Sequence, residues 1–279
     1  MTPPRNVSAL QRAFRMMATT NEEGSRLQLI AANVVAGQFL RGAVMRGGAS
    51  LKLRYGNETT RWTIDFDASR SISEDGFVEA YTERLREGWN GFSGRIVKMP
   101  KAHPRAIPGE YVMQPFEIKL TYNNRPWCTV PFELSYNEVG DADNFDLIDL
   151  PPGVLEIFAK LGLPAPAPFP LMKIAHQVAQ KLHGLTDPNS VRAQDLIDLQ
   201  LILSREQVDF AETCAICRRL FANRKRQSWP PHFVADSTEW ALAYERQRGT
   251  LPVIPTISEA VAWANELIVK IEGAGEMRK

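Results

Sequence analysis

The chain lacks the sequence features of exported and membrane-spanning proteins. It has only three cysteines in 279 residues, Cys128, Cys214 and Cys217, which is too few for the disulfide framework of small secreted domains. Its N-terminus has no continuous apolar core of the kind that a signal peptide needs. No apolar run approaches the roughly 18 to 20 residues that span a bilayer as a helix. These absences predict a cytoplasmic protein with reduced thiols and no membrane partner.

The chain also lacks an excess of charge of either sign. Its 33 Lys and Arg residues balance 32 Asp and Glu residues, which leaves a net charge of +1. The whole-chain charge therefore does not indicate a polyanionic partner. Basic residues nevertheless cluster without acids in two stretches, residues 93–109 and 214–228. Such clusters are typical of solvated surfaces, and they are also candidate contacts for a nucleic-acid backbone.

Hydrophobic periodicity divides the chain into two parts. The first part mixes helices and strands. Helices are predicted over residues 8–18, 26–43, 49–56 and 73–89, and strands over residues 43–46 and 61–67 and within residues 94–137, where residues 123–127 mark the turn of a hairpin. From residue 151 onward the pattern is helical, and the one short stretch that could be a strand, residues 251–255, begins and ends near prolines that disfavour it. The sequence therefore predicts an α+β lobe over residues 1–150 and a helical lobe over residues 151–279, with the proline-rich residues 164–170 as a rigid connector.

A pair of glycines follows the strand predicted near residues 43–46. Gly47 and Gly48 precede Ala49 and Ser50 at the start of a short predicted helix. Backbone N–H groups at such a helix start can bind a phosphate, and the Ser50 hydroxyl would add a donor. A plain turn followed by a helix cap has the same pattern, so the glycines alone leave both interpretations open.

Two aspartates alternate with apolar residues in the strand predicted over residues 61–67. This alternation places Asp65 and Asp67 on one face, about 6 to 7 Å apart at their Cα atoms. Two carboxylates at this short distance repel each other unless a cation lies between them. Oxygen ligands favour Mg²⁺ or Mn²⁺ over zinc. Glu133, on a neighbouring predicted strand, could supply a third carboxylate. The alternative is an ordinary exposed strand edge.

A third group of charged residues lies in the helical part. Arg192, Asp195 and Asp198 are spaced three apart on one predicted helical face, and Lys181 lies near the end of the preceding predicted helix. An ion pair on the surface would explain this spacing. The leucines and isoleucine interleaved with the acids favour a face that is not wholly solvated.

Taken in order, these stretches resemble the nucleotidyltransferase toxins of the AbiEii/AbiGii family, the toxin halves of bacterial abortive-infection toxin–antitoxin pairs. The resemblance covers residues 27 to about 205. Its four motifs are Gly47-Gly48-Ala49-Ser50-Leu51, Arg61-x-Thr63-x-Asp65-x-Asp67, Lys181, and Arg192-x-x-Asp195-Leu196-x-Asp198-Leu199. The chain departs from the family at one strand, where the family usually has Lys-x-Asp and this sequence has Pro131-Phe132-Glu133.

The resemblance implies a DNA-polymerase-β-like nucleotidyltransferase lobe and transfer of a nucleoside monophosphate from an NTP to an acceptor, dependent on Mg²⁺ or Mn²⁺. It implies catalytic roles for Asp65, Asp67, Lys181 and Asp198, nucleotide-binding roles for Gly47, Gly48, Ser50, Thr63, Arg192 and Asp195, and metal ligation by Asp65, Asp67 and Glu133. Lys181 would neutralise triphosphate charge, oriented by Asp195 or Asp198. The Thr63 hydroxyl would line the site, where an antitoxin could add phosphate.

Some members of the family add nucleotides to tRNA 3′ ends. The resemblance therefore implies an RNA acceptor, with tRNA as the first choice, and a separately encoded antitoxin protein as a partner. Two alternatives stay open. The enzyme could modify a protein or a small molecule, or the chain could be a degenerate member that binds nucleotide or a partner without catalysis, as the change at Glu133 and the missing lysine would suggest.

Overall fold

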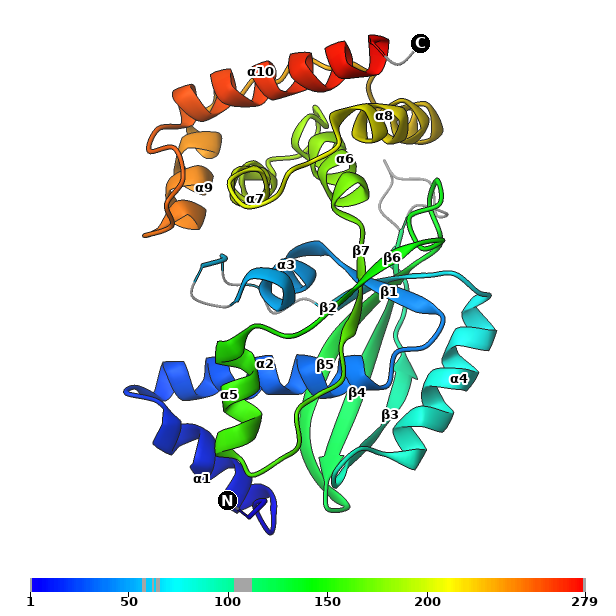
Figure 1. Ribbon diagram of the computed structural model, residues 1–279, viewed down its shortest axis with the longest axis vertical. Coiled ribbons are helices and arrows are strands. Elements are labelled where there is room, and N and C mark those ends of the chain that lie inside the picture. Colours follow the sequence, from blue (N-terminus) through cyan, green and yellow to red (C-terminus); the bar gives the residue numbers. More distant parts are fainter. Residues whose placement is uncertain (1, 57–58, 62, 64–65, 103–111, 278–279) are drawn as a thin grey trace. The chain divides into compact units, whose positions relative to one another are not determined.

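The structure is a computed structural model of the chain (Figure 1). It describes residues 2–56, 59–61, 63, 66–102 and 112–277. The chain divides into two compact units. Unit 1 consists of Met1–Asn57 and Trp62–Met172, and unit 2 consists of Glu58–Arg61 and Lys173–Lys279.

Unit 1 contains a mixed sheet of seven strands in the order β3-β4-β5-β2-β1-β7-β6. The strands are β1 (Ala43–Arg46), β2 (Phe66–Arg70), β3 (Phe92–Lys98), β4 (Gln114–Tyr122), β5 (Arg125–Ser135), β6 (Phe145–Ile148) and β7 (Phe169–Met172). β2 runs parallel to β5 and β1 runs parallel to β7, whereas the other neighbouring pairs are antiparallel. The helices of this unit are α1 (Val7–Met17), α2 (Asn21–Gln38), α3 (Gly47–Tyr55), α4 (Glu74–Glu87) and α5 (Pro152–Lys160).

The α+β fold class is confirmed, and local signals explain several of its elements. The Asn6 side chain caps α1 by accepting from Ala9 N, and the Leu10 and Phe14 stripe of this helix is buried. A two-residue loop joins β4 to β5, and both of its residues, Asn123 and Asn124, have positive φ. Asparagine tolerates that conformation, which tight hairpins require. The predicted hairpin is therefore confirmed.

The two faces of the central strands differ in chemistry. Phe132 on β5 points into the core, where its ring centroid lies 5.3 Å from that of Phe66, 5.8 Å from Phe77, 6.1 Å from Tyr81 and 6.0 Å from Phe116. Successive side chains of a strand point to opposite faces. The residues that alternate with Phe66 and Phe132 therefore lie on the other face of the sheet, which carries the polar side chains of the site.

Two short strands, β6 and β7, have no counterpart among the strands predicted from the sequence. The expectation that no strand follows residue 151 is wrong, because β7 pairs with β1 and β6. It overlaps the proline-rich residues 164–170, of which Phe169 and Pro170 are part of the strand. Four residues including a proline carry too little periodicity to reveal a strand, and its partners are distant in sequence. The predicted strand over residues 61–67 is displaced among the described residues, since β2 spans Phe66–Arg70.

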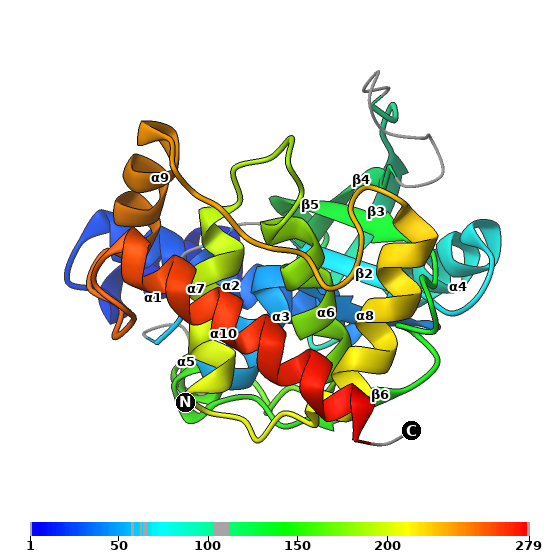
Figure 2. The same ribbon diagram turned by 90° about the horizontal axis from the view of Figure 1, so that it is seen from above.

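Unit 2 is helical, and its long helices are α6 (Ile174–Leu185), α7 (Ala193–Leu203), α8 (Phe210–Arg224), α9 (Thr238–Arg248) and α10 (Ile257–Glu276). α8 packs against α6 and α10, and α7 packs against α6 and α9 (Figure 2). No described helix is both long enough and apolar enough to cross a membrane. The sequence-based division at residue 150 assigns α5 and β7 to the helical lobe, whereas in the structure both belong to unit 1. The independence of the two lobes as domains stays a prediction.

The aromatic cluster predicts the effect of a core substitution. We expect Phe132→Ala to lower the free energy of unfolding by about 3 to 5 kcal/mol, because it removes a fully buried ring and leaves a cavity. The matched control is Phe145→Ala on β6, where the side chain is 50% exposed, and we expect a loss below about 1 kcal/mol. Urea unfolding followed by circular dichroism measures both values. Equal losses would contradict the assignment of Phe132 to the core.

Candidate active site

The glycine pair and Asp67 lie next to each other. β1 ends at Arg46, and α3 begins at once with Gly47 and Gly48. Gly47 has a φ of +67°, and a Cβ atom added to it would lie 2.6 Å from Asp67 Oδ2. Only glycine fits this position without displacing the carboxylate. The fold thus joins a helix start to an acidic side chain about twenty positions further along the chain.

The start of α3 is suited to binding an anion. Its N-cap residue, Arg46, makes no side-chain capping bond, and the first N–H groups of a helix have no partner within that helix. The helix dipole adds partial positive charge at this end. The Ser50 hydroxyl donates to Gly47 O at 2.8 Å and is fully buried. Ser50 therefore braces the turn, and its direct contact with phosphate stays a prediction.

Two of the three predicted metal-binding carboxylates lie on neighbouring strands. Asp67 on β2 is in register with Glu133 on the parallel strand β5, so the two side chains share a face of the sheet. Asp67 is partly buried and Glu133 is exposed. Asp65 lies outside the described residues. Oxygen ligands at this position fit Mg²⁺ or Mn²⁺, although no group of three possible ligands is found within the described part of the chain.

A buried polar network lies beside the carboxylates, and the sequence analysis does not predict it. Arg46 Nη1 donates to Ser135 Oγ at 2.8 Å and to Ser69 Oγ at 3.2 Å. It lies 3.7 Å from Asp141 Oδ2, which also accepts from Ser69 at 3.1 Å. Ser69 and Ser135 are register partners two residues beyond Asp67 and Glu133. The network therefore ties β1, β2 and β5 together on the face that carries the predicted metal ligands.

The network holds its acid in an unusual environment. Asp141 is fully buried, and this burial raises the pKa of its carboxyl group above the ordinary value, although the Arg46 charge and the hydrogen bonds from Glu138 N and Ser69 act in the opposite direction. Arg46 immediately precedes the glycine pair, and this position in the sequence could have marked it as a residue of the site. Asp141 lies in a loop, where no periodicity could have identified it.

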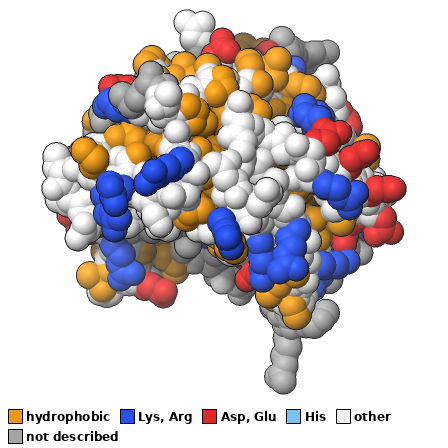
Figure 3. Space-filling model, turned by 90° about the horizontal axis from the view of Figure 1, so that it is seen from below, with side chains coloured by type: hydrophobic (Ala, Val, Ile, Leu, Met, Phe, Trp, Pro, Cys, Tyr) orange, Lys and Arg blue, Asp and Glu red, His pale blue; other side chains and the backbone are white. Residues whose placement is uncertain are grey.

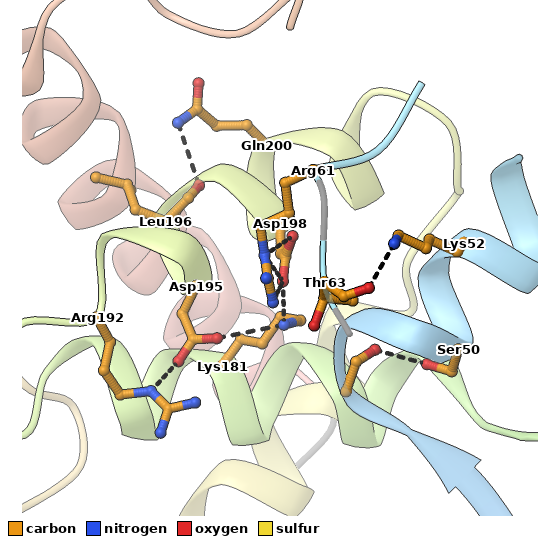
Figure 4. Close-up of polar contacts among 11 residues, drawn as sticks. Ser50, Lys52, Arg61, Thr63, Lys181, Arg192, Asp195, Leu196, Asp198 and Gln200 are labelled. Atoms are coloured by element: carbon orange, nitrogen blue, oxygen red, sulfur yellow. Dashed lines mark hydrogen bonds and ion pairs between the residues drawn. The ribbon is translucent and has the colours of Figure 1, made fainter. Parts of the chain in front are cut away.

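A buried lysine fixes the backbone ahead of the aspartates. Lys52 on α3 donates from Nζ to the Thr63 carbonyl oxygen at 2.6 Å, and both residues are buried. The same helix that begins with the glycine pair therefore holds the chain at Thr63 (Figure 4). The structure places Thr63 by its main chain, and a role for its hydroxyl stays a prediction.

Within unit 2, Lys181 lies between two aspartates. Its Nζ atom is 2.6 Å from Asp198 Oδ2 and 3.3 Å from Asp195 Oδ1 (Figure 4). The side chains are almost completely buried, with exposed fractions of 7% for Lys181, 4% for Asp195 and 1% for Asp198. The interpretation as a surface ion pair is therefore wrong. The leucines of α7 that alternate with these acids, Leu196 and Leu199, are buried as well.

Two arginines extend the cluster at its ends. Arg192 Nε contacts Asp195 Oδ2 at 2.5 Å. Arg61, which belongs to unit 2 although it precedes Asp65 by four positions, binds both oxygens of Asp198 at 3.0 and 3.1 Å. The family motif contains Arg61, although the motif alone predicts no role for this residue. Three cations and two carboxylates thus form one chain of contacts.

The cations determine the charge of Asp195. Burial pushes the pKa of its carboxyl group upward, but Lys181, Arg192 and Arg61 more than offset this effect, and the pKa lies below its ordinary value. Asp195 is therefore ionised at neutral pH, and its carboxylate helps to fix the position of the Lys181 side chain. A lysine fixed in this way could neutralise phosphate charge.

The fold resembles that of solved structures. It is similar to the nucleotidyltransferase toxin MenT4 from Mycobacterium tuberculosis, with 15% sequence identity, a TM-score of 0.53, and coverage of 95% of this chain and 89% of that chain. JHP933 from Helicobacter pylori is 16% identical with a TM-score of 0.48, over 94% of this chain and 96% of that chain. No curated protein sequence matches the chain.

Comparison of the sequence with known protein families identifies the family of this chain. Residues 28–263 match the family described as the nucleotidyl transferase AbiEii toxin of type IV toxin–antitoxin systems. The chain therefore belongs to the AbiEii nucleotidyltransferase toxins, and the resemblance that its motifs predicted is confirmed. It is a nucleotidyltransferase and the toxin of a type IV pair, so an NTP substrate and an antitoxin partner follow from its family.

The contact between Gly47 and Asp67 predicts the effect of adding one methyl group. We expect Gly47→Ala to lower the free energy of unfolding by at least about 1 kcal/mol, because alanine is strained at a φ of +67° and its Cβ would displace the carboxylate. The matched control is Gly153→Ala in α5, where an added Cβ meets no atom within 4 Å, and we expect a change below about 1 kcal/mol in the stabilising direction. Thermal unfolding compares the variants, and similar changes in both would contradict the close approach.

The ion cluster predicts a pH dependence. Because the folded-state pKa of Asp195 is lowered, its charge contributes stability that is present above the ordinary Asp value of about 4 and is lost as the pH falls through the folded pKa. We expect Asp195→Asn to be less stable by about 3 to 5 kcal/mol at pH 7 and to lack this acid-dependent component. Urea unfolding between pH 7 and acid conditions measures both effects. The exposed Asp236→Asn is the control and should follow the wild type; an Asp195→Asn curve parallel to the wild type would rule out the assignment.

Proposed function

We propose that this toxin transfers a nucleoside monophosphate from an NTP to an RNA acceptor in the cytoplasm, with tRNA as the first candidate and Mg²⁺ or Mn²⁺ as the cofactor. The observation that carries the proposal is the contact between the Gly47 turn and the Asp67 carboxylate. It supplies an anion-binding helix start and an acidic metal ligand at one place, and a triphosphate that carries a divalent ion needs both.

The proposed reaction is a substitution at phosphorus. A hydroxyl oxygen of the acceptor forms a bond to the α-phosphorus of the NTP, the bond from this phosphorus to the bridging oxygen breaks, and pyrophosphate leaves. The hydroxyl proton passes to a nearby carboxylate or to water. Asp65, Asp67 and Glu133 would hold divalent ions, which stabilise the charge of the phosphoryl oxygens and activate the hydroxyl in sites of this kind.

The other residues have supporting roles in this proposal. Backbone N–H groups at Gly47 and Gly48 bind the β- and γ-phosphates. Lys181 adds positive charge for the triphosphate, and its ion pairs with Asp195 and Asp198 fix its position. Arg192 is proposed to contact the nucleotide. Control by a separately encoded antitoxin and a role in abortive phage infection complete the proposal.

Transfer of label tests the proposal directly. The purified protein is incubated with Mg²⁺, total tRNA and each of the four NTPs labelled at the α-phosphate. We expect label in RNA with at least one NTP. We expect the transfer rate of Asp67→Asn to be lower by about 100-fold or more, because the loss of a metal ligand raises the activation barrier by several kcal/mol. The exposed Asp149→Asn in the same unit is the matched control and should retain activity.

The same assay separates the alternatives. Label found in protein alone would replace RNA by a protein acceptor, and absence of transfer with measurable NTP binding would identify a degenerate, non-catalytic member. Glu133→Gln addresses the departure from the family pattern: we expect reduced transfer that added Mn²⁺ partly restores. Unchanged transfer in Glu133→Gln would remove Glu133 from the proposed metal site.

A growth experiment tests the link between chemistry and toxicity. Induced expression of the wild type should slow bacterial growth, and Asp67→Asn or Lys181→Ala should relieve the effect at equal protein levels. Both variants remaining as toxic as the wild type would show that toxicity does not depend on the proposed site.

A further inference from the structure

Unit 2 contains an open hollow with basic and aromatic walls at the end of α8. Its volume is roughly 530 Å³, and its lining includes Arg218, Lys225, Arg226, Phe221 and Trp229. Hollows of this size accommodate small organic molecules such as a nucleotide. All of its lining residues belong to unit 2.

The aromatic wall is held in place by two contacts. The Trp229 ring packs edge-to-face on Phe221, with centroids 5.2 Å apart and an interplanar angle of 71°. Trp229 Nε1 donates to Glu272 Oε2 on α10 at 2.5 Å. Phe221 is buried, whereas Trp229 is partly exposed. A partly exposed ring that is already oriented loses little entropy when a flat ligand stacks on it.

The basic wall carries a small excess of positive charge. Arg218 pairs with Glu272 at 2.5 Å and Arg226 pairs with Asp187 at 3.3 Å. The Lys225 side chain is exposed, and its ammonium makes no ion pair with any described residue. Three cations against two carboxylates leave one positive charge. This charge fits one phosphodiester group, which carries a single negative charge, better than a triphosphate.

Basic side chains alone do not identify a binding site on this protein. On the face drawn in Figure 3, some Lys and Arg side chains lie next to one another and others are separated by hydrophobic and uncharged surface. The hollow at α8 differs because cations, an oriented aromatic ring and a concave surface occur together. This combination is the one by which proteins bind unpaired nucleotides, with the base on the ring and the phosphate on the cations.

We propose that the hollow formed by Arg218, Phe221, Lys225, Arg226 and Trp229 binds one unpaired nucleotide of a single-stranded RNA segment. This inference rests on the proposed function in naming RNA as the strand, since the RNA acceptor belongs to that proposal. The base packs against Trp229, and Lys225 contacts the adjoining phosphodiester. Duplex RNA binds less tightly, because its bases are already paired and stacked.

Binding of a short, unstructured, fluorescent RNA oligonucleotide, measured by anisotropy at several salt concentrations, tests the inference. We expect Lys225→Glu to weaken binding about tenfold and to reduce the slope of log K against log salt by about 0.7. Trp229→Ala should weaken binding by about 5- to 150-fold, whereas Trp229→Phe should retain most of it. The matched control is Arg219→Glu, an exposed residue of the same helix outside the lining of the hollow, which should bind RNA nearly as the wild type does.

The outcomes distinguish this site from the proposed reaction. Equal losses of RNA binding in Lys225→Glu and Arg219→Glu would overturn the proposal that the hollow binds RNA, even if label transfer to RNA succeeds. RNA binding at the wild-type level by folded Trp229→Ala would overturn it as well. RNA binding that depends on Lys225 and Trp229 and persists in Asp67→Asn would support the hollow even if no transfer is found. NTP binding should be the same in the hollow variants and the wild type, and equal loss of NTP and RNA binding would contradict the assignment to a polynucleotide.

Discussion

The close approach between the Gly47 backbone and the Asp67 carboxylate is the contact on which the candidate site in unit 1 depends. β1 and β2 pair so that Arg46 lies opposite Asp67, and the chain must turn into α3 at the next residue. A side chain at position 47 would occupy the space of the carboxylate. A helix start that can bind an anion and an acid that can bind a cation are therefore neighbours, which is the arrangement that a metal-bound triphosphate requires.

Buried polar contacts hold this arrangement and the cluster of unit 2 in place. Arg46 joins three strands through Ser69 and Ser135, and Lys181 joins α6 to α7 through two aspartates. Charges taken out of water are costly unless their partners are well placed, so removing one partner costs more than the pair itself contributes. Such networks are weak evidence for stability and better evidence for a fixed geometry. We infer that geometry is the reason for their burial in this protein.

The predictions for the site come from local motifs. Gly47 and Gly48 need no tertiary information to be recognised as a possible phosphate-binding turn, and period-two alternation predicts that the two aspartates share one face of a strand. The family assignment, confirmed over residues 28–263, followed from the order of these motifs. The prediction failed where the signal was weak or distant: β7 has only four residues and includes Pro170, and Asp141 lies in a loop.

Short-range periodicity and residue chemistry are enough to predict the α+β class, the helical second part and the family, because each of them leaves a pattern in neighbouring residues. Which charged groups of the motifs contact one another depends on the tertiary structure. Arg61 binds Asp198 across 137 positions, and Asp67 lies in register with Glu133. Contacts of this kind depend on strand order and helix packing, which arise from the burial of the whole core and leave no mark at any single position.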